Sequence, residues 1–149
     1  MAIARHIARK HDLLGKTPEE FATADMVEGV IADWREKWVE VCYNPNFESV
    51  KADYLSLVPS FVEPLERFLK GRKWFVGENL TYADFLAFEL ILQNLTLAPA
   101  LLDGCPNLVG FLKNFRELEG IRETEKKFEG YLVNDPLGSF NATIKAPEN

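Results

Sequence analysis

The sequence predicts an all-α fold, in which about six helices pack into one bundle. Three observations lead to this prediction. Apolar residues recur every three or four positions through most of the chain, as on the buried face of a helix. Polar helix-start motifs stand directly before two of these patterns. Neither the apolar–polar alternation of a β-strand nor an internal repeat is visible, so strands are not expected.

Residues 81–95 form the helix around which we expect the rest of the chain to pack. Thr81 and Asp84 have the spacing of a capping box, in which two side chains satisfy each other's backbone N–H groups at a helix start. The residues that follow are apolar on nearly all sides, which is typical of a helix at the centre of a domain. Asp84 is therefore interpreted as a structural residue, not as a catalytic carboxylate.

Two helices are predicted in the amino-terminal part of the chain. Residues 1–11 have an amphipathic pattern, with cations toward the carboxyl end, where the helix dipole favours them. Thr17 and Pro18 then supply an N-cap and a first helical residue for a long helix that runs to about Tyr43. An Asn-Pro-Asn turn follows it.

The next helical pattern covers residues 47–70 and contains two prolines. Pro59 and Pro64 each remove a backbone donor, so we expect them to kink or interrupt this helix. Further helices are predicted over residues 107–118 and 119–128, followed by a tail without periodicity from Gly130 onward. We expect this tail to wrap around the bundle or to dangle from it.

Length and charge limit the possible functions. At 149 residues the chain is most simply one domain with a sizeable core. The net charge of −6 and the isoelectric point near 5.0 disfavour nucleic acid and anionic membranes as partners. No apolar run is long enough to cross a membrane and no signal-peptide pattern is visible, so we expect a cytoplasmic protein.

No metal site or permanently bound cofactor is predicted. Cys42 and Cys105 lie far apart, without the spacing of a metal site, and we interpret them as thiols in a reducing compartment. His6 and His11 are five residues apart, whereas two histidines that share a metal on a helix lie four apart. Neither a nucleophile motif nor a glycine-rich phosphate loop is present.

The long helix carries two candidate binding residues. Asp33 lies beside apolar positions of this helix, so its carboxylate either faces a cleft and holds an ammonium group or is a solvated surface residue. Tyr43 closes the same helix, and its phenol either donates to a developing anion or is simply a half-buried tyrosine. The residues alone leave both pairs of alternatives open.

Four segments together resemble the glutathione transferases. They read MAIARHIARKH, VCYNPNFESVKADYL, RKWFVGENLTYADFLAFE and LLDGCPNL, and the Cys-Tyr-Asn-Pro stretch is similar to the mu class. The resemblance covers residues 1 to about 128. It implies that residues 1–11 are the end of the last helix of a thioredoxin-like domain, and that residues 12–149 are the all-α C-terminal domain of the family. The Thr81–Asp84 capping box matches the folding motif of that domain.

The resemblance also implies roles for individual residues. Asp33 matches a carboxylate that meets the γ-glutamyl ammonium of glutathione bound in the neighbouring subunit, and Tyr43 matches a phenol that lies over the electrophile. Ala32 and Arg35 match the helix face that lines the electrophile pocket, where the family often has other residues. Charged positions of the dimer interface are matched by Arg5, Arg9 and Asp25.

The predicted function is therefore conjugation of glutathione thiolate to small hydrophobic electrophiles, a detoxifying reaction, with glutathione as co-substrate. A homodimer is expected, with neither nucleic acid nor membrane as partner. In the family a thioredoxin-like domain precedes this segment and supplies the groups that form the thiolate, so this chain alone is expected to be inactive. The alternative is a non-catalytic helical module that works by binding or docking.

Overall fold

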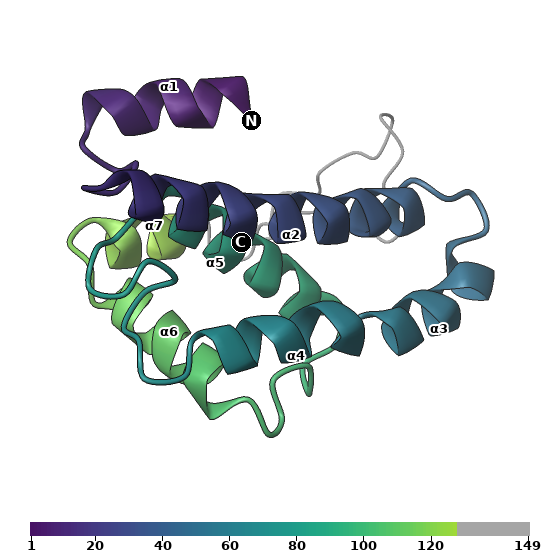
Figure 1. The fold of residues 1–149 in the computed structure, drawn as a ribbon. Helices are drawn as coiled ribbons and strands as arrows, with labels where there is room; N and C mark the ends of the chain where they lie inside the picture. Colours follow the sequence, from purple (N-terminus) through teal and green to yellow (C-terminus); the bar gives the residue numbers. More distant parts are fainter. Residues whose placement is uncertain (128–149) are drawn as a thin grey trace.

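The computed structural model describes residues 1–127, and these residues are built from helices (Figure 1). In chain order the helices are α1 (Ala2–Lys10), α2 (Pro18–Cys42), α3 (Phe47–Leu57), α4 (Pro59–Phe68), α5 (Tyr82–Leu97), α6 (Pro106–Arg116) and α7 (Ile121–Lys127). Within this part of the chain the only strand-like pairing is two isolated β-bridges. The all-α prediction is confirmed, while the tail predicted from Gly130 lies outside the described residues.

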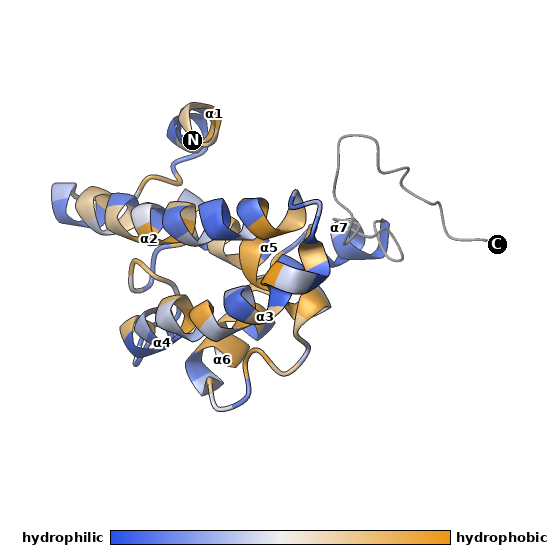
Figure 2. Ribbon diagram, turned by 90° about the vertical axis from the view of Figure 1, so that its right-hand side faces the viewer, coloured by the Kyte–Doolittle hydropathy of each residue, from blue (hydrophilic) through white to orange (hydrophobic). Residues whose placement is uncertain are grey.

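Helix α5 occupies the centre of the bundle, as its sequence predicts. It packs most extensively against α2 and also contacts α1, and much of its ribbon is coloured as hydrophobic (Figures 1 and 2). Ala83, Ala87 and Ile91 are fully buried and lie on one face of α5. The hydrophobic core forms one continuous cluster, which is typical of a single domain.

The predicted capping box starts α5 and ties it to the preceding turn. Asp84 Oδ2 accepts hydrogen bonds from the backbone N–H and the hydroxyl of Thr81, at 2.7 and 3.0 Å. Its second oxygen, Oδ1, accepts the backbone N–H of Phe75 at 2.9 Å. Because Asp84 and Thr81 are both fully buried, these bonds take the place of water at the helix start. Asp84 is thus structural, as predicted.

The prolines of the third helical pattern have different effects. Pro59 ends α3 and becomes the first residue of α4, a position at which the missing N–H costs nothing. Pro64 stays inside α4, which continues to Phe68. One interruption therefore divides the predicted segment into two helices, and this division accounts for seven helices among residues 1–127 where about six were expected.

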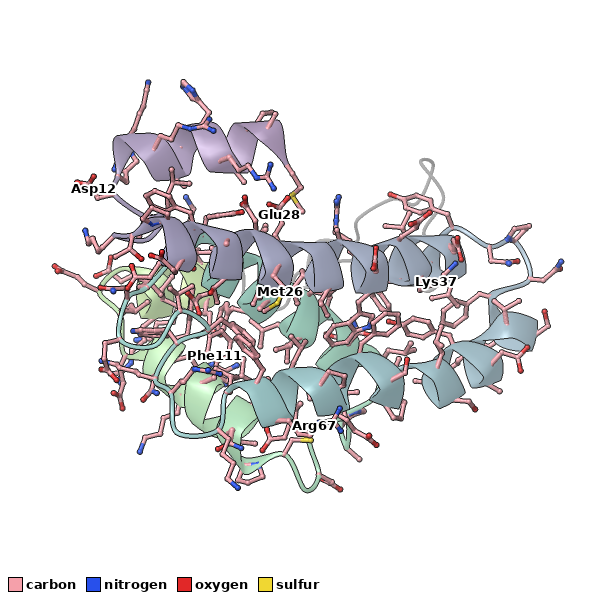
Figure 3. All side chains as sticks on the ribbon, viewed as in Figure 1. Asp12, Met26, Glu28, Lys37, Arg67 and Phe111 are labelled. Carbon is pink, nitrogen blue, oxygen red and sulfur yellow. The ribbon has the colours of Figure 1, made fainter. Side chains whose placement is uncertain are left out.

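Aromatic rings fill the space between α5, α6 and the turn before α5. Phe115 stacks on Phe88 with ring centroids 4.2 Å apart and meets the edge of Trp74 at 5.9 Å. Phe111 contacts Phe75 at 5.2 Å and points into the interior (Figure 3). Such edge-to-face and offset contacts add to the burial of large apolar surfaces, so this cluster fixes α6 on the central helix.

A short polar chain crosses the core between α2, α3 and α5. The indole Nε1 of Trp34 donates to the hydroxyl of Tyr54 at 3.0 Å, and that hydroxyl donates in turn to Oδ1 of Asn94. Asn94 Nδ2 completes the chain by donating to the carbonyl of Leu90 at 2.9 Å. Burial raises the pKa of the Tyr54 phenol, which therefore stays protonated and acts as both acceptor and donor.

None of the helices among residues 1–127 combines the length and the apolar character that crossing a membrane requires.

Candidate functional site

The candidate site lies on α2, whose length carries side chains from the region of α1 to that of α3 (Figure 1). Its start is fixed as the sequence predicts. Thr17 is the N-cap and its hydroxyl accepts the backbone N–H of Glu20 at 3.2 Å, with Pro18 in the first helical position. Its buried face packs against α5 and α3, while Arg35, Val39 and Tyr43 on another side of the helix are exposed.

Three of the predicted site residues lie along one side of this helix. Ala32, Arg35 and Tyr43 fall within roughly a third of the helix circumference, because successive residues are about 100° apart. Ala32 is half-buried, Arg35 is exposed, and Tyr43 is 46% exposed at the C-cap. The side chains of this stripe therefore share one side of the carboxyl-terminal half of α2.

Sequence reasoning missed one member of this stripe. Val39 precedes Tyr43 by one helical turn, and its carbonyl accepts the Tyr43 backbone N–H at 3.0 Å. It is 39% exposed, so it presents an apolar surface beside the phenol. The signal was available, because an apolar residue four positions before Tyr43 shares its face on a helix. Together they combine an apolar wall with a hydrogen-bond donor.

Asp33 lies apart from this stripe. It is about a quarter turn from Ala32 around α2, and its side chain is exposed. The structure of one chain thus does not bring Asp33 and Tyr43 together. An exposed carboxylate that points away from the apolar stripe can meet a cation that approaches from outside this chain.

A second cluster joins α1 to α2 and α5. Arg5 forms an ion pair with the buried carboxylate of Glu28, with Nη2 and Oε2 at 2.6 Å, and lies 3.4 Å from Asp25. The phenol of Tyr82 lies 2.6 Å from Asp25 Oδ1 and 2.7 Å from Glu28 Oε2. Figure 3 shows Glu28 between α1 and α2. Arg9, the third residue predicted with Arg5 and Asp25, is exposed on α1 outside this cluster.

The cluster keeps Arg5 charged and Tyr82 protonated. The phenol of Tyr82 and the carboxylate of Glu28 raise the pKa of Arg5, which therefore stays charged. Burial raises the pKa of Tyr82, and the carboxylates of Asp25 and Glu28 raise it further. Sequence reasoning missed Glu28 and Tyr82. The signal for Glu28 was a carboxylate at an apolar-period position of α2, between Val27 and Ile31.

Both thiols are poor nucleophiles. Cys42 is buried, and burial raises the pKa of its thiol to about 11. Cys105 is half-buried, and its pKa is raised by burial and by the nearby carboxylates of Glu66, Glu63 and Asp103. Within residues 1–127 no group of three or more histidine, cysteine, aspartate or glutamate side chains is arranged to hold a metal ion.

Comparison with known proteins agrees with the fold and with the sequence motifs. The family model "Glutathione S-transferase, C-terminal domain" matches residues 32–127, which is more than half of the chain. Glutathione S-transferase Mu 4 of Rattus norvegicus and Glutathione S-transferase Mu 1 of Mus musculus are each 42% identical to it over 120 residues. These residues are 80% of this chain and 55% of each relative, so the chain spans little more than half the length of these relatives.

Solved structures give the same result. The Pi-class glutathione S-transferase of Onchocerca volvulus superimposes with a TM-score of 0.83 at 27% identity, over 93% of this chain and 69% of that one. The glutathione S-transferase Blo t 8 gives 0.80 at 25% identity, with the same coverage of both chains. Sequence motifs, helical architecture and capping box all agree with these similarities. The chain belongs to the glutathione S-transferase family, through the C-terminal domain of that family.

Proposed function

We propose that this chain supplies the electrophile-binding and dimer-forming half of a mu-like glutathione transferase. The complete enzyme joins the sulfur of glutathione to small hydrophobic electrophiles, with glutathione as co-substrate and no permanently bound cofactor. The observation that carries the proposal is the stripe of α2, where the half-exposed Tyr43 lies one turn from Val39 and on the same side of the helix as Arg35 and Ala32. The similarity to mu-class transferases along 80% of the chain supports it.

Tyr43 has the chemistry to assist the departure of an oxygen. When a thiolate attacks an epoxide carbon, a carbon–sulfur bond forms, the carbon–oxygen bond breaks, and the oxygen leaves as an alkoxide that needs a proton. A phenol beside the apolar wall of Val39 donates that proton or a hydrogen bond as the charge develops. An activated aryl chloride loses chloride, which needs no proton, so Tyr43 contributes little to that reaction.

Asp33 is proposed to bind glutathione held by a second copy of the chain. Its exposed carboxylate lies away from the electrophile stripe, as expected for a group that reaches across a subunit boundary. An ammonium group and a carboxylate form a charge-assisted hydrogen bond, so the γ-glutamyl amine is a suitable partner. A homodimer in which Arg5, Arg9 and Asp25 lie at or near the interface would place Asp33 in this role.

The proposal also assigns the two parts of the chain to two domains of the complete enzyme. Residues 1–11 would be the end of the last helix of a thioredoxin-like domain, and residues 12–149 the helical C-terminal domain. The exposure of Ile3 and Ile7, at 77% and 48%, supports the assignment, because two isoleucines on one face of α1 are suited to contact with another domain. The thioredoxin-like domain would supply the groups that form the thiolate, and the enzyme would act in the cytoplasm.

The test is a Tyr43→Phe variant of the protein in the form in which it occurs, assayed with two electrophiles. With an epoxide we expect kcat to fall by about tenfold or more, because the proton donor is lost. With an aryl chloride activated by two nitro groups the rate should change little, and this reaction is the control. Equal rates for the variant and the unmodified protein with the epoxide would contradict the role of Tyr43.

Glutathione affinity tests the second half of the proposal. Asp33→Asn should weaken glutathione binding several-fold and leave the relative rates of the two electrophiles unchanged, because the residue contacts the co-substrate and not the electrophile. The mass of the native species is measured alongside, to determine whether the chain occurs together with a thioredoxin-like domain. A helical module that only docks with other proteins would conjugate neither electrophile and would lose no function when only the hydroxyl of Tyr43 is removed.

A further inference from the structure

A cavity of about 300 Å³ lies between the carboxyl end of α2 and helix α3. Figure 3 shows Lys37 at this end of α2, above α3. The cavity is lined by Lys37, Glu40, Val41 and Asn44 from the end of α2, and by Val50, Asp53, Tyr54 and Leu57 from α3. None of the residues of the electrophile stripe, Ala32, Arg35, Val39 and Tyr43, lines this cavity, and neither does Asp33.

The cavity has an apolar side and a charged side. Val41, Val50 and Leu57 present hydrocarbon, and the buried ring of Tyr54 closes the wall between them. The hydroxyl of Tyr54 is already engaged with Trp34 and Asn94 inside the core, so only its ring serves the cavity. An apolar or aromatic body of one or two rings is suited to this surface.

The charges at the rim leave one carboxylate uncompensated. Lys37 is paired with Glu40, its Nζ lying 2.9 and 3.1 Å from the two carboxylate oxygens. Asp53 forms neither an ion pair nor a hydrogen bond with any side chain among residues 1–127. The rim therefore carries a net charge of −1, from two carboxylates and one ammonium group, and it attracts a cation more than an anion.

We propose that this cavity binds small aromatic or alkyl amines in their protonated form. The apolar body lies against Val41, Val50 and Leu57, and the ammonium group reaches Asp53 as its ion-pair partner. The side-chain carbonyl of Asn44, also on the lining, already accepts the backbone N–H of Asn46, so Asp53 is the acceptor that the proposal assigns to the ammonium group. The site does not depend on the proposed transferase reaction, since it shares neither Asp33 nor Tyr43.

The core provides a reporter beside this site. Trp38 packs against Tyr54, with ring centroids 5.7 Å apart. Its indole Nε1 is the one buried side-chain nitrogen or oxygen among residues 1–127 that has no hydrogen-bond partner. Because Trp38 is one residue from Lys37 and in contact with the wall of the cavity, its indole N–H resonance should respond when the cavity is filled.

The experiment titrates the full-length, ¹⁵N-labelled chain with three matched compounds followed by NMR. Tryptamine is the cation, tryptophol is the neutral analogue and indole-3-propionate is the anion, and all three carry the same indole ring. We expect tryptamine to shift the amides of residues 37–57 and the Trp38 indole signal, with tryptophol weaker and indole-3-propionate weakest. Added salt should weaken the binding of tryptamine more than that of tryptophol.

Two substitutions with different expected effects test the assignment of Asp53 as the partner of the ammonium group. Asp53→Asn should weaken tryptamine binding by about threefold to tenfold and leave tryptophol binding unchanged, because only the ion pair is lost. Lys37→Gln should leave tryptamine binding unchanged or strengthen it. Asp103→Asn, a change of an exposed carboxylate that does not line the cavity, is the matched control and should have no effect.

Three results would overturn the proposal. One is equal affinity for the three compounds, and another is stronger binding of the anion that is lost in Lys37→Gln. The third is shifts at Ala32, Val39 and Tyr43 in place of residues 37–57, because the amine would then occupy the electrophile stripe. Leu57→Arg provides a second variant, since it fills the cavity and brings a cation to it, and it should abolish tryptamine binding. Tyr43→Phe, which should slow the epoxide reaction, should leave tryptamine binding at this cavity unchanged, so the two proposals fail independently.

Discussion

The carboxylate of Glu66, on α4, accepts a hydrogen bond from the backbone N–H of Leu108, on α6, with Oε2 and N 2.8 Å apart. Its other oxygen accepts the backbone N–H of Asn107 at 3.0 Å. Cys105, the N-cap residue of α6, provides no side-chain hydrogen bond of its own. Glu66 thus caps α6 from another helix and satisfies two N–H groups that a helix start leaves open.

Removal of this cap should destabilise the bundle. We expect Glu66→Ala to lower the free energy of unfolding by about 1–2 kcal/mol, in the range of a lost N-cap. Chemical denaturation measures the change. Glu63→Ala, which removes an exposed carboxylate one turn earlier with only a 3.8 Å contact to Arg67, is the control and should cost less than about 0.5 kcal/mol. Equal effects of the two changes would show that Glu66 is not a cap.

Tyr54 should be the most sensitive polar residue of the core. Tyr54→Phe leaves Trp34 Nε1 and Asn94 Oδ1 without their shared hydroxyl in a buried position, and we expect a loss of about 2–3 kcal/mol. A double-mutant cycle with Asn94→Ala is the check, measured by denaturation. The two changes should be clearly non-additive because both break the same bond, whereas additive effects would mean that the hydrogen bond between Tyr54 and Asn94 contributes nothing.

Tyr82 should control how firmly α1 is held. Tyr82→Phe removes the hydroxyl that lies against Asp25 and Glu28, and we expect the free energy of unfolding to fall by about 1–2 kcal/mol. The amides of α1 should also exchange with solvent faster, because α1 is joined to this cluster through Arg5. Lys10→Ala changes an exposed residue of the same helix and should alter neither quantity. Unchanged exchange in Tyr82→Phe would contradict the anchoring role.

The buried carboxyl of Asp84 predicts an unusual pH dependence. Burial raises the pKa of Asp84 above its ordinary value, against the opposing hydrogen bonds from Phe75 and Thr81. The folded chain therefore keeps this proton to a higher pH than the unfolded chain. Between about pH 3.9, the ordinary pKa in an unfolded chain, and the raised pKa of the folded chain, the unfolded chain binds fewer protons than the folded chain. The contribution of Asp84 to the free energy of unfolding is therefore lost as pH rises through this range.

The measurement compares the unfolding free energy of the unmodified protein with that of Asp84→Asn between about pH 3 and pH 7. The difference between them, unmodified minus variant, should decrease as pH rises, because only the unmodified chain carries the titrating group. A difference that increases with pH would mean that hydrogen bonding outweighs burial at this site.

The thiols should differ in reactivity. Cys105 is half-buried whereas Cys42 is 2% exposed, so iodoacetamide should alkylate Cys105 first in the native protein. Since the thiolate is the reactive form and both pKa values are raised, labelling should be slow at neutral pH and faster in alkali. Mass spectrometry follows the reaction. Cys105→Ser should leave the native chain almost unlabelled until denaturant exposes Cys42.

Most of the fold could be predicted from local sequence signals. Thr17 with Pro18, and Thr81 with Asp84, mark helix starts because the bonds they make lie within a few residues of each other. The apolar character of α5 predicted its central place, since such a helix has no face to turn to water. The bounds of α3 and α4 were less certain, because a proline inside a pattern either begins a new helix or kinks the existing one, and Pro59 and Pro64 do different things.

The candidate site was only partly predictable. Tyr43, Ala32 and Arg35 share one face of a continuous helix, so their spacing and the family resemblance bring them together. The spacing also places Val39 on this face, although no role was predicted for it. Asp33 points elsewhere, and its proposed function depends on a second subunit, which the sequence of one chain does not contain.

The sequence by itself determined the helices, their order, the central place of α5 and the family, because periodicity, caps and local motifs depend on neighbouring residues. Tertiary structure alone decided which distant groups meet: Glu66 with the start of α6, Tyr82 with Glu28, Tyr54 with Asn94, and Asp53 with the cavity beside α2. The physical reason is that a hydrogen bond or ion pair forms only within about 3–4 Å. Such distances between separate helices are set by how their side chains pack, and packing is a property of the whole bundle.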